Sequence, residues 1–204
     1  MNAKLEAHRK LFILEKKKNS PTVFGIGWHK TGTTSLGFAL ETLGYTVQNS
    51  AIDRHPLYEG NIDGLITQLD DFDACQDCPW NLIFKELYQR FPSGKFILTI
   101  RDEKEWLKSV TNHFQDKYSK TREFAYGTGK GSPLGNEAAY LKRYKLHNAD
   151  VISFFEDKPD QLLILNLAEN HPWNALCSFL KKEKPTMGFP HKNKRRWSLK
   201  GRFI

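Results

Sequence analysis

The sequence contains no long hydrophobic run. A helix that crosses a bilayer needs roughly 20 consecutive, mostly apolar residues, and no stretch of this chain approaches that length. Near the N-terminus the apolar run 11–14 is too short for the core of a secretory signal. We therefore expect a cytoplasmic protein without a membrane span.

Cysteine is scarce as well. The 3 cysteines, Cys75, Cys78 and Cys177, are too few for a disulfide framework, which agrees with a reducing compartment. Cys75 and Cys78 have the C-x-x-C spacing of zinc and redox sites, but the chain has no second such pair and no spaced histidine pair to complete a metal site. We expect these cysteines to be small buried hydrophobic residues.

Acidic residues are outnumbered. The chain has 23 of them against 31 lysines and arginines, which gives a formal charge of +8 and an isoelectric point near 9.3. The excess favours an anionic partner, but it does not separate a nucleic acid from a small polyanion. A chain of 204 residues, 39 % of them hydrophobic, can bury one substantial core. We expect a single domain over 1–204, with a basic N-terminal extension at 1–20 and a basic C-terminal segment at 186–204.

Short β-type runs alternate with longer helical patterns, which is typical of a parallel sheet covered by helices on both faces. We expect strands at 22–27, 45–48, 72–76, 95–100 and 161–167. We expect helices at 34–44, 81–91, 101–114, 137–155 and 172–183. The predicted fold class is α/β, with three layers and a central, mainly parallel sheet of about five strands. Residues 117–136, rich in glycine and polar side chains, are predicted to form a long loop.

A glycine-rich loop follows the first predicted strand. Gly27 and Gly32, followed by Thr33 and Thr34, have the frame of the nucleotide-triphosphatase loop G-x-x-x-x-G-K-[ST]. The lysine is displaced, because Thr33 stands where that motif has lysine and Lys30 lies three residues earlier. That lysine normally neutralises the β- and γ-phosphates, so this loop is a poor ATPase loop.

The loop nevertheless predicts an anion site. Backbone N–H groups and the positive end of a helix dipole point at one spot where a strand, a glycine turn and a helix follow one another. Four hydroxyls can add to them: Thr31, Thr33, Thr34 and Ser35. The alternative is an ordinary strand-to-helix turn with a Ser or Thr cap.

Arg101 directly follows the predicted strand 95–100, at the end where ligands of open α/β sheets bind. Ser109 lies eight residues further, about two helical turns away. A ligand that contacts both must lie along the helix or at its N-terminal approach. The alternatives are a surface ion pair for Arg101 and a solvent-facing position for Ser109.

Together these motifs resemble those of the sulfotransferases that use 3′-phosphoadenosine 5′-phosphosulfate (PAPS). The segments GWHKTGTTSL and FILTIRDEKEWLKSV carry most of the resemblance, which extends over about Val23 to Asn193. The pattern is that of a bacterial-type branch with KTGTTSL … D-x-P-W … KEL … F-I-L-T-x-R-D … W-x-x-S … FPH-x-N. The resemblance implies a P-loop-like fold and transfer of a sulfuryl group from PAPS to a hydroxyl or amine of a small-molecule, lipid or carbohydrate acceptor.

The resemblance also implies roles for individual residues. Arg101 and Ser109 would bind the 3′-phosphate, a group that ATP lacks. Lys30 would stabilise the charge on the leaving phosphate of the product, 3′,5′-diphosphoadenosine (PAP), without a metal. The 5′-phosphosulfate would be bound by Lys30, Thr31, Gly32, Thr33, Thr34 and Ser35.

Two positions depart from the family's usual residues. The cytosolic branch has tryptophan where this chain has Ser35, so adenine stacking must come from elsewhere. His29 stands at a position that is usually proline, where it either faces the acceptor or is a surface histidine.

The expected general base lies at the end of the third strand. Many relatives have histidine there, whereas this chain has Asp77, followed by Cys78, Pro79 and Trp80. A free aspartate has a pKa of about 3.9, and an apolar setting would raise it towards the range of a useful base. The alternative is that Asp77 caps the helix that follows.

The basic C-terminal segment has three candidate contacts for a lid over the 3′-phosphate: Lys192, Lys194 and Arg195. The acceptor pocket is expected around 53–64 and 117–136, although neither segment has a motif that names a substrate.

Two other functions remain open on the sequence. A small ATP-dependent kinase would share the loop frame and could use Asp102 as a metal-binding acid, although the displaced Lys30 argues against it. A nucleic-acid-binding protein would use the basic ends of the chain, whereas the sulfotransferase interpretation expects no nucleic acid.

Overall fold

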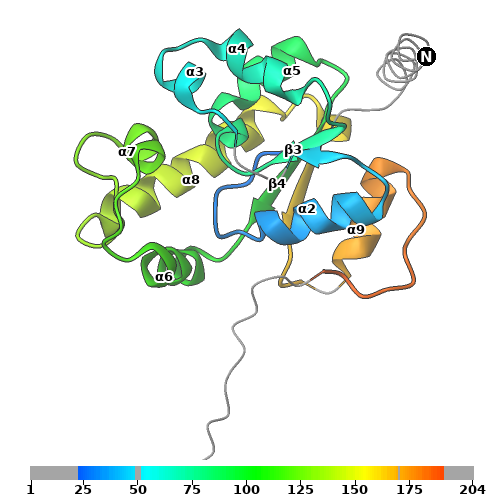
Figure 1. Cartoon of the computed structure of the whole chain (residues 1–204). Helices are drawn as coiled ribbons and strands as arrows, with labels where there is room; N and C mark the ends of the chain where they lie inside the picture. Colours follow the sequence, from blue (N-terminus) through cyan, green and yellow to red (C-terminus); the bar gives the residue numbers. More distant parts are fainter. Residues whose placement is uncertain (1–22, 49–51, 170, 191–204) are drawn as a thin grey trace, which may run out of the picture.

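The computed structural model describes residues 23–48, 52–169 and 171–190. Its centre is a five-stranded sheet in the order β2-β3-β1-β4-β5, in which every neighbouring pair is parallel (Figure 1). The prediction of an α/β fold with a central parallel sheet is confirmed. The strands are β1 (Val23–Gly25), β2 (Val47–Gln48), β3 (Ala74–Gln76), β4 (Lys95–Ile100) and β5 (Leu162–Asn166).

The helices cover both faces of this sheet. They are α2 (Thr33–Thr42), α3 (His55–Tyr58), α4 (Ile62–Ile66), α5 (Phe84–Arg90), α6 (Glu103–Phe114), α7 (Lys120–Tyr126), α8 (Glu137–Phe154) and α9 (Pro172–Leu180). Three short 3-10 helices, η1 (Thr67–Leu69), η2 (Trp80–Ile83) and η3 (Pro159–Gln161), complete the elements of the described residues.

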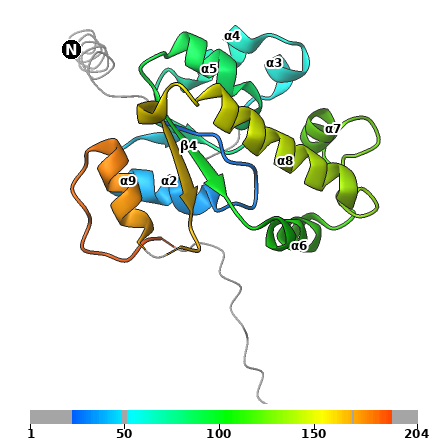
Figure 2. The same ribbon diagram turned by 180° about the vertical axis from the view of Figure 1, so that it is seen from behind.

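The alternation of side chains along the strands separates two cores. Val23 and Ile97 pack with α2 and α9 on one face, while Phe24 and Phe96 pack with α5 and α8 on the other. Figures 1 and 2, from opposite sides, both show α2 next to α9. Burial of alternate residues on both faces explains the continuous apolar run of β4.

A third cluster is aromatic and lies beyond the carboxyl ends of the strands. Trp28, from the loop after β1, packs there with Trp106 of α6 and Tyr126 of α7. Val110 of α6 and Tyr140 and Tyr144 of α8 complete it. The helices α6, α7 and α8 lie together in both views (Figures 1 and 2). This cluster fixes the elements that surround the loop after β1.

The structure corrects two expectations about the connecting segments. The prediction of a long loop over 117–136 was wrong for Lys120–Tyr126, which forms α7. Ser119 caps this helix by accepting a hydrogen bond from the N–H of Arg122, and Tyr126 is buried at its end. No helix or strand was expected in the segment 53–64. It contains α3 and the first turn of α4, which continues to Ile66.

The cysteines are free thiols; Cys75 and Cys177 are buried, as expected, and Cys78 is partly buried. Within the described residues, no helix is both long and apolar enough to cross a membrane.

Candidate active site at the carboxyl ends of the strands

Two glycines shape the loop between β1 and α2. A Cβ on Gly27 would lie 1.9 Å from Oγ1 of Thr99, so only glycine lets the loop pass this close to β4. Gly32 has a φ of 104°, where side chains are strained, and a Cβ there would lie 2.3 Å from Leu167. Lys30 also has a positive φ, 66°. The loop therefore has a special backbone conformation directly before the N-terminus of α2, the end of a helix that favours an anion.

Thr31 fastens this loop to the sheet. Its hydroxyl donates to the carbonyl of Trp28 at 2.5 Å and lies 2.6 Å from the hydroxyl of Thr99. Thr31 as a whole is only 4 % exposed to solvent. The Thr31 side chain is thus engaged within the protein, and its predicted contact with the phosphosulfate stays a prediction.

One cavity of about 350 Å³ brings the other predicted residues together. From the loop and α2 it is lined by Lys30, Gly32, Thr33, Thr34 and Ser35, and from the neighbouring elements by Asp77, Arg101 and Ser109. Ser109 lies in the second half of α6, so the cavity extends along the side of that helix. We call it the donor cavity.

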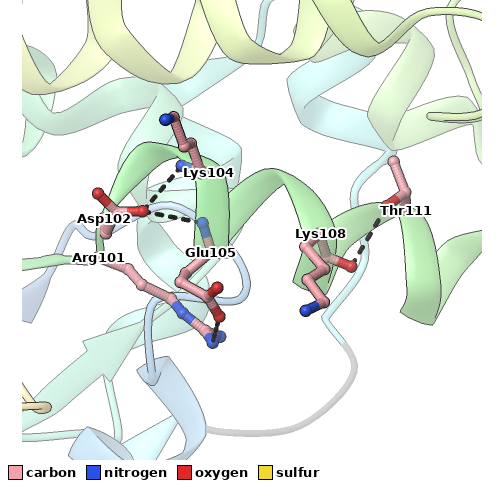
Figure 3. Close-up of polar contacts among 6 residues, drawn as sticks. All are labelled: Arg101, Asp102, Lys104, Glu105, Lys108 and Thr111. Carbon is pink, nitrogen blue, oxygen red and sulfur yellow. Dashed lines mark hydrogen bonds and ion pairs between the residues drawn. The ribbon is translucent and has the colours of Figure 1, made fainter.

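Arg101 is held at its main chain. The hydroxyl of Tyr144 accepts a hydrogen bond from the N–H of Arg101 at 2.9 Å and donates one to its carbonyl at 2.8 Å. The ring of Tyr144 is stacked on Trp106, with centroids 4.2 Å apart. The guanidinium contacts the Glu105 carboxylate over 3.4 Å (Figure 3). Because both groups of this ion pair are exposed to solvent, it is weak and can yield to a stronger anion.

Asp102 caps α6. Its carboxylate accepts hydrogen bonds of 3.0 Å from the N–H groups of Lys104 and Glu105 (Figure 3). Asp102 is not among the residues that line the donor cavity. This is a structural role, and it weakens the kinase interpretation in which Asp102 binds a metal. In the described part of the chain no group of three His, Cys, Asp or Glu side chains could hold a metal ion.

Asp77 follows β3 with a φ of 69°. Its carboxylate accepts hydrogen bonds from the hydroxyl of Thr33 at 2.9 Å and from the N–H of Cys78 at 2.8 Å. The helical turn after it, η2, has Pro79 at its N-cap and no side-chain cap, so the alternative of Asp77 as a helix cap is wrong. Burial raises the pKa of Asp77, although hydrogen bonds from Cys78 and Thr33 partly oppose this.

His29 lies among aromatic rings rather than at the surface. It packs between Trp106 and Phe114, and its Nε2 lies 2.7 Å from the hydroxyl of Tyr126. That hydroxyl also accepts a hydrogen bond from Nε1 of Trp28, which can only donate. Burial, together with nearby cations such as Arg122, lowers the pKa of His29 to about 3. His29 is therefore neutral near pH 7.

Two further cavities adjoin the donor cavity. One of about 270 Å³ shares His29, Asp77 and Phe114 with it and is otherwise lined largely by residues of α7 and of the segments around Arg54 and Asn81. We call this the α7 cavity. Another, of about 750 Å³, shares Lys30, Gly32, Ser35 and Arg101 and is lined by residues 166–169 and 184–189.

A family model described as a sulfotransferase domain matches residues 22–131 and 122–197. The two matches together cover most of the chain. The chain belongs to the sulfotransferase family. No curated protein matches it.

Sequence reasoning missed the aromatic residues that surround the candidate site of this sulfotransferase-family chain. Trp106 donates from Nε1 to the carbonyl of His29 at 2.8 Å, which ties α6 to the loop. Tyr140, Tyr144 and His147 are all buried on α8 at i, i+4 and i+7. This helical spacing in the sequence indicated which side of the helix faces inward. It did not reveal that the hydroxyl of Tyr144 holds the main chain of Arg101.

The predicted C-terminal lid falls largely outside the described residues. Lys192, Lys194 and Arg195 all belong to 191–204, which the structure does not describe. The described residues just before them, 184–189, line the cavity of about 750 Å³ beside Arg101.

Proposed function

We propose that this protein transfers a sulfuryl group from PAPS to a hydroxyl or amine of a small-molecule acceptor. Membership of the sulfotransferase family supports the reaction class. The observation that carries the assignment of the donor is the single cavity lined by Lys30, Asp77, Arg101 and Ser109. Four kinds of group surround this one space: the Lys30 ammonium beside the N-terminus of α2, the Asp77 carboxylate, whose pKa is raised, the Arg101 guanidinium and the Ser109 hydroxyl.

The residues of the donor cavity fit the two anionic ends of PAPS. The 5′-phosphosulfate would lie at the N-terminus of α2, against Lys30 and the hydroxyls of the loop. The 3′-phosphate would be bound by Arg101, which exchanges Glu105 for a ligand of higher charge, and by Ser109. The adjoining cavity of about 750 Å³ offers room for the nucleoside, beside Trp173 and Phe189.

In the proposed reaction PAPS supplies the sulfuryl group, whose bond to the 5′-phosphate breaks as a bond to the acceptor oxygen or nitrogen forms. Asp77 takes the acceptor proton, and the electron pair of the broken bond stays on PAP. Lys30 and the N–H groups at the start of α2 stabilise the charge that grows on the leaving phosphate. Positioning and positive charge are thus the main contributions of the protein.

The hydrogen bond from Thr33 to Asp77 gives the proposed base a fixed orientation toward the loop. It also limits how far burial raises the pKa of Asp77, because it stabilises the charged carboxylate. The raised pKa makes the carboxylate of Asp77 a stronger base than that of a free aspartate.

A comparison of two nucleotides tests the proposal. We expect PAP to bind at least about tenfold more tightly than adenosine 5′-phosphate in a calorimetric titration, because only PAP carries the 3′-phosphate for Arg101 and Ser109. Equal affinities would overturn the donor assignment. Turnover of ATP with Mg²⁺, without any response to PAPS, would instead establish a kinase.

The setting of the reaction belongs to the same proposal. We propose a cytoplasmic enzyme of one domain whose basic C-terminal segment closes over the nucleotide. The free thiols of Cys75, Cys78 and Cys177 support a reducing compartment. Binding to nucleic acid through the basic ends would fall steeply with salt and ignore the 3′-phosphate of PAP, so the same titrations, repeated at higher salt, discriminate against it.

A further inference from the structure

The α7 cavity begins where the donor cavity ends. His29, Asp77 and Phe114 line both, so a molecule in the α7 cavity lies next to the carboxylate that would take the acceptor proton. The two segments in which an acceptor pocket was expected meet here, since Arg54 comes from one and Arg122 from the other.

Two arginines give this cavity an unbalanced positive charge. Arg122 donates from Nε to the carbonyl of Gly131 at 3.0 Å and from Nη2 to that of Lys117. Arg54 reaches the carbonyl of Cys78 at 3.4 Å. Within the described residues these partners are neutral carbonyls, and no carboxylate forms an ion pair with either arginine. Carbonyl oxygens orient a guanidinium, but they leave its charge uncompensated.

The other groups that line the cavity do not cancel this charge. Asp77 is the one acidic residue among those that line it, and His29 is neutral. The remaining lining is uncharged: Trp28, Leu82 and Ala125 supply apolar surface, Ser119 and Thr121 supply hydroxyls, and the ring of Phe114 lies under the Arg122 guanidinium, with its centroid 4.3 Å from Cζ. Two guanidiniums therefore face one carboxylate across a partly apolar space.

Two buried polar atoms beside this space have no partner in the described part of the chain. Asn81 is 1 % exposed, and its side-chain Oδ1 is buried without a hydrogen bond. Nε of Arg54 is likewise buried and without a hydrogen bond. Buried polar groups are rarely left unpaired, because each forfeits its hydrogen bonds with water. Arg54 and Asn81 both line the α7 cavity, so a small side-chain shift would bring these atoms to a ligand that carries one donor and one anionic acceptor.

We propose that the α7 cavity is the acceptor site and that the acceptor is a small hydroxyl compound carrying an oxyanion, such as a carboxylate. Arg54 and Arg122 bind the oxyanion, the apolar lining contacts the body of the molecule, and the reacting hydroxyl points to Asp77. A volume of about 270 Å³ suits a compound of about one ring and is small for a lipid or an oligosaccharide. This inference rests on the proposed function, from which it takes the role of Asp77.

A matched pair of probes tests it. 4-Hydroxyphenylacetate and 4-hydroxyphenylacetamide have nearly the same shape and the same phenol, and they differ in charge. We expect the carboxylate to bind the PAP-saturated protein at least about tenfold more tightly than the amide by calorimetry, and to be sulfated with the higher kcat/KM. 4-Hydroxybenzylphosphonate, as a third probe, distinguishes a site for carboxylates from one that accepts any oxyanion.

Arg54→Gln tests the residue itself, with Arg90→Gln as the control. Arg90 is an exposed arginine on α5 and does not line the cavity, so its replacement removes the same charge elsewhere. We expect Arg54→Gln to reduce the preference for the carboxylate to about twofold or less, and Arg90→Gln to leave it unchanged. Arg122 is less suitable, because its hydrogen bonds hold the ends of the α7 segment together.

The outcomes separate this inference from the proposed function. Suppose that PAP binds more tightly than adenosine 5′-phosphate, but the carboxylate and amide probes bind equally, or neither binds. The acceptor inference is then overturned, while the donor assignment stands. A preference for the carboxylate that survives Arg54→Gln also overturns it. If PAP and adenosine 5′-phosphate bind equally, the proposed function itself is wrong.

Discussion

The hydroxyl of Thr33 donates a hydrogen bond of 2.9 Å to Oδ2 of Asp77. Thr33 is the first residue of α2, and Asp77 follows β3, which is the neighbour of β1 in the sheet. The bond therefore joins the start of α2, directly after the glycine-rich loop, to the proposed base across two adjacent strand ends.

Thr33→Val removes this bond and should shift the pH dependence of turnover. The bond lowers the pKa of Asp77, so its loss raises that pKa further above the ordinary value. A base must be deprotonated, so activity is lost as the pH falls through its pKa. We expect the acid limb of kcat/KM to move to higher pH in Thr33→Val.

Thr33→Ser is the matched control, since it keeps the hydroxyl and should keep the acid limb of the original protein. An acid limb that stays in place in Thr33→Val would show that this bond does not act on the base. PAP affinity, measured on the same samples, separates this effect from a weaker phosphate site.

Asp77→Asn should abolish most turnover and leave PAP binding largely intact. The amide keeps the size of the carboxylate but cannot take a proton, and the loss of a general base typically costs about 10²- to 10⁴-fold in rate. Single-turnover transfer from PAPS measures the effect. Asp102→Asn serves as the control, because asparagine is as good a helix cap as aspartate and Asp102 lies outside the donor cavity.

Near-normal transfer by Asp77→Asn would remove Asp77 from the mechanism. A loss of ATP turnover in Asp102→Asn, together with normal activity of Asp77→Asn, would favour the kinase interpretation.

Arg101→Gln should weaken PAP without weakening adenosine 5′-phosphate. A charge-assisted hydrogen bond to a phosphate is worth about 1.5–3 kcal/mol, so the affinity for PAP should fall by roughly 10- to 100-fold. Lys108→Gln removes the same charge from the same helix, where Lys108 is exposed and does not line the donor cavity (Figure 3). Equal effects of both variants on PAP would mean that only the general charge of α6 matters.

The sequence predicted those parts of the molecule that depend on local or strongly periodic signals. The bounds of β4 were predicted as observed, because a continuous apolar run is typical of a strand buried on both faces. The glycine-rich loop was found from Gly27 and Gly32, and the structure requires glycine at both positions. A side chain on Gly27 would collide with Thr99, and Gly32 has a positive φ.

Other features depend on contacts between distant residues and left no local signal. Tyr144 holds Arg101 from 43 positions away, and His29 is linked through the hydroxyl of Tyr126 to Trp28. The helix α7 has only 7 residues, too few for a periodic pattern, and its formation depends on the Ser119 cap and on the burial of Tyr126. The sequence thus named candidate site residues one by one, whereas the contacts that surround them depend on the fold.

His147 should make the protein less stable as the pH falls. It is 1 % exposed, lies 2.8 Å through Nε2 from the carbonyl of Ile26, and its pKa is lowered to about 4, mainly by burial. Since its ordinary value is 6.5, the unfolded chain binds the proton more readily than the folded one between these two pH values. Stability is therefore full above pH 6.5 and declines below it, by on the order of 2 kcal/mol at pH 5 from this residue.

His147→Gln tests this, because the amide nitrogen of glutamine can replace Nε2 as the donor to the Ile26 carbonyl without titrating. Urea unfolding at pH 7.5 and pH 5 gives the free energy of unfolding of both proteins. We expect the loss of stability between the two pH values to be smaller in His147→Gln, although His29, whose pKa is also lowered, preserves part of it. The same loss in both proteins would show that His147 is not held neutral by its burial, and that the pH dependence arises from other groups.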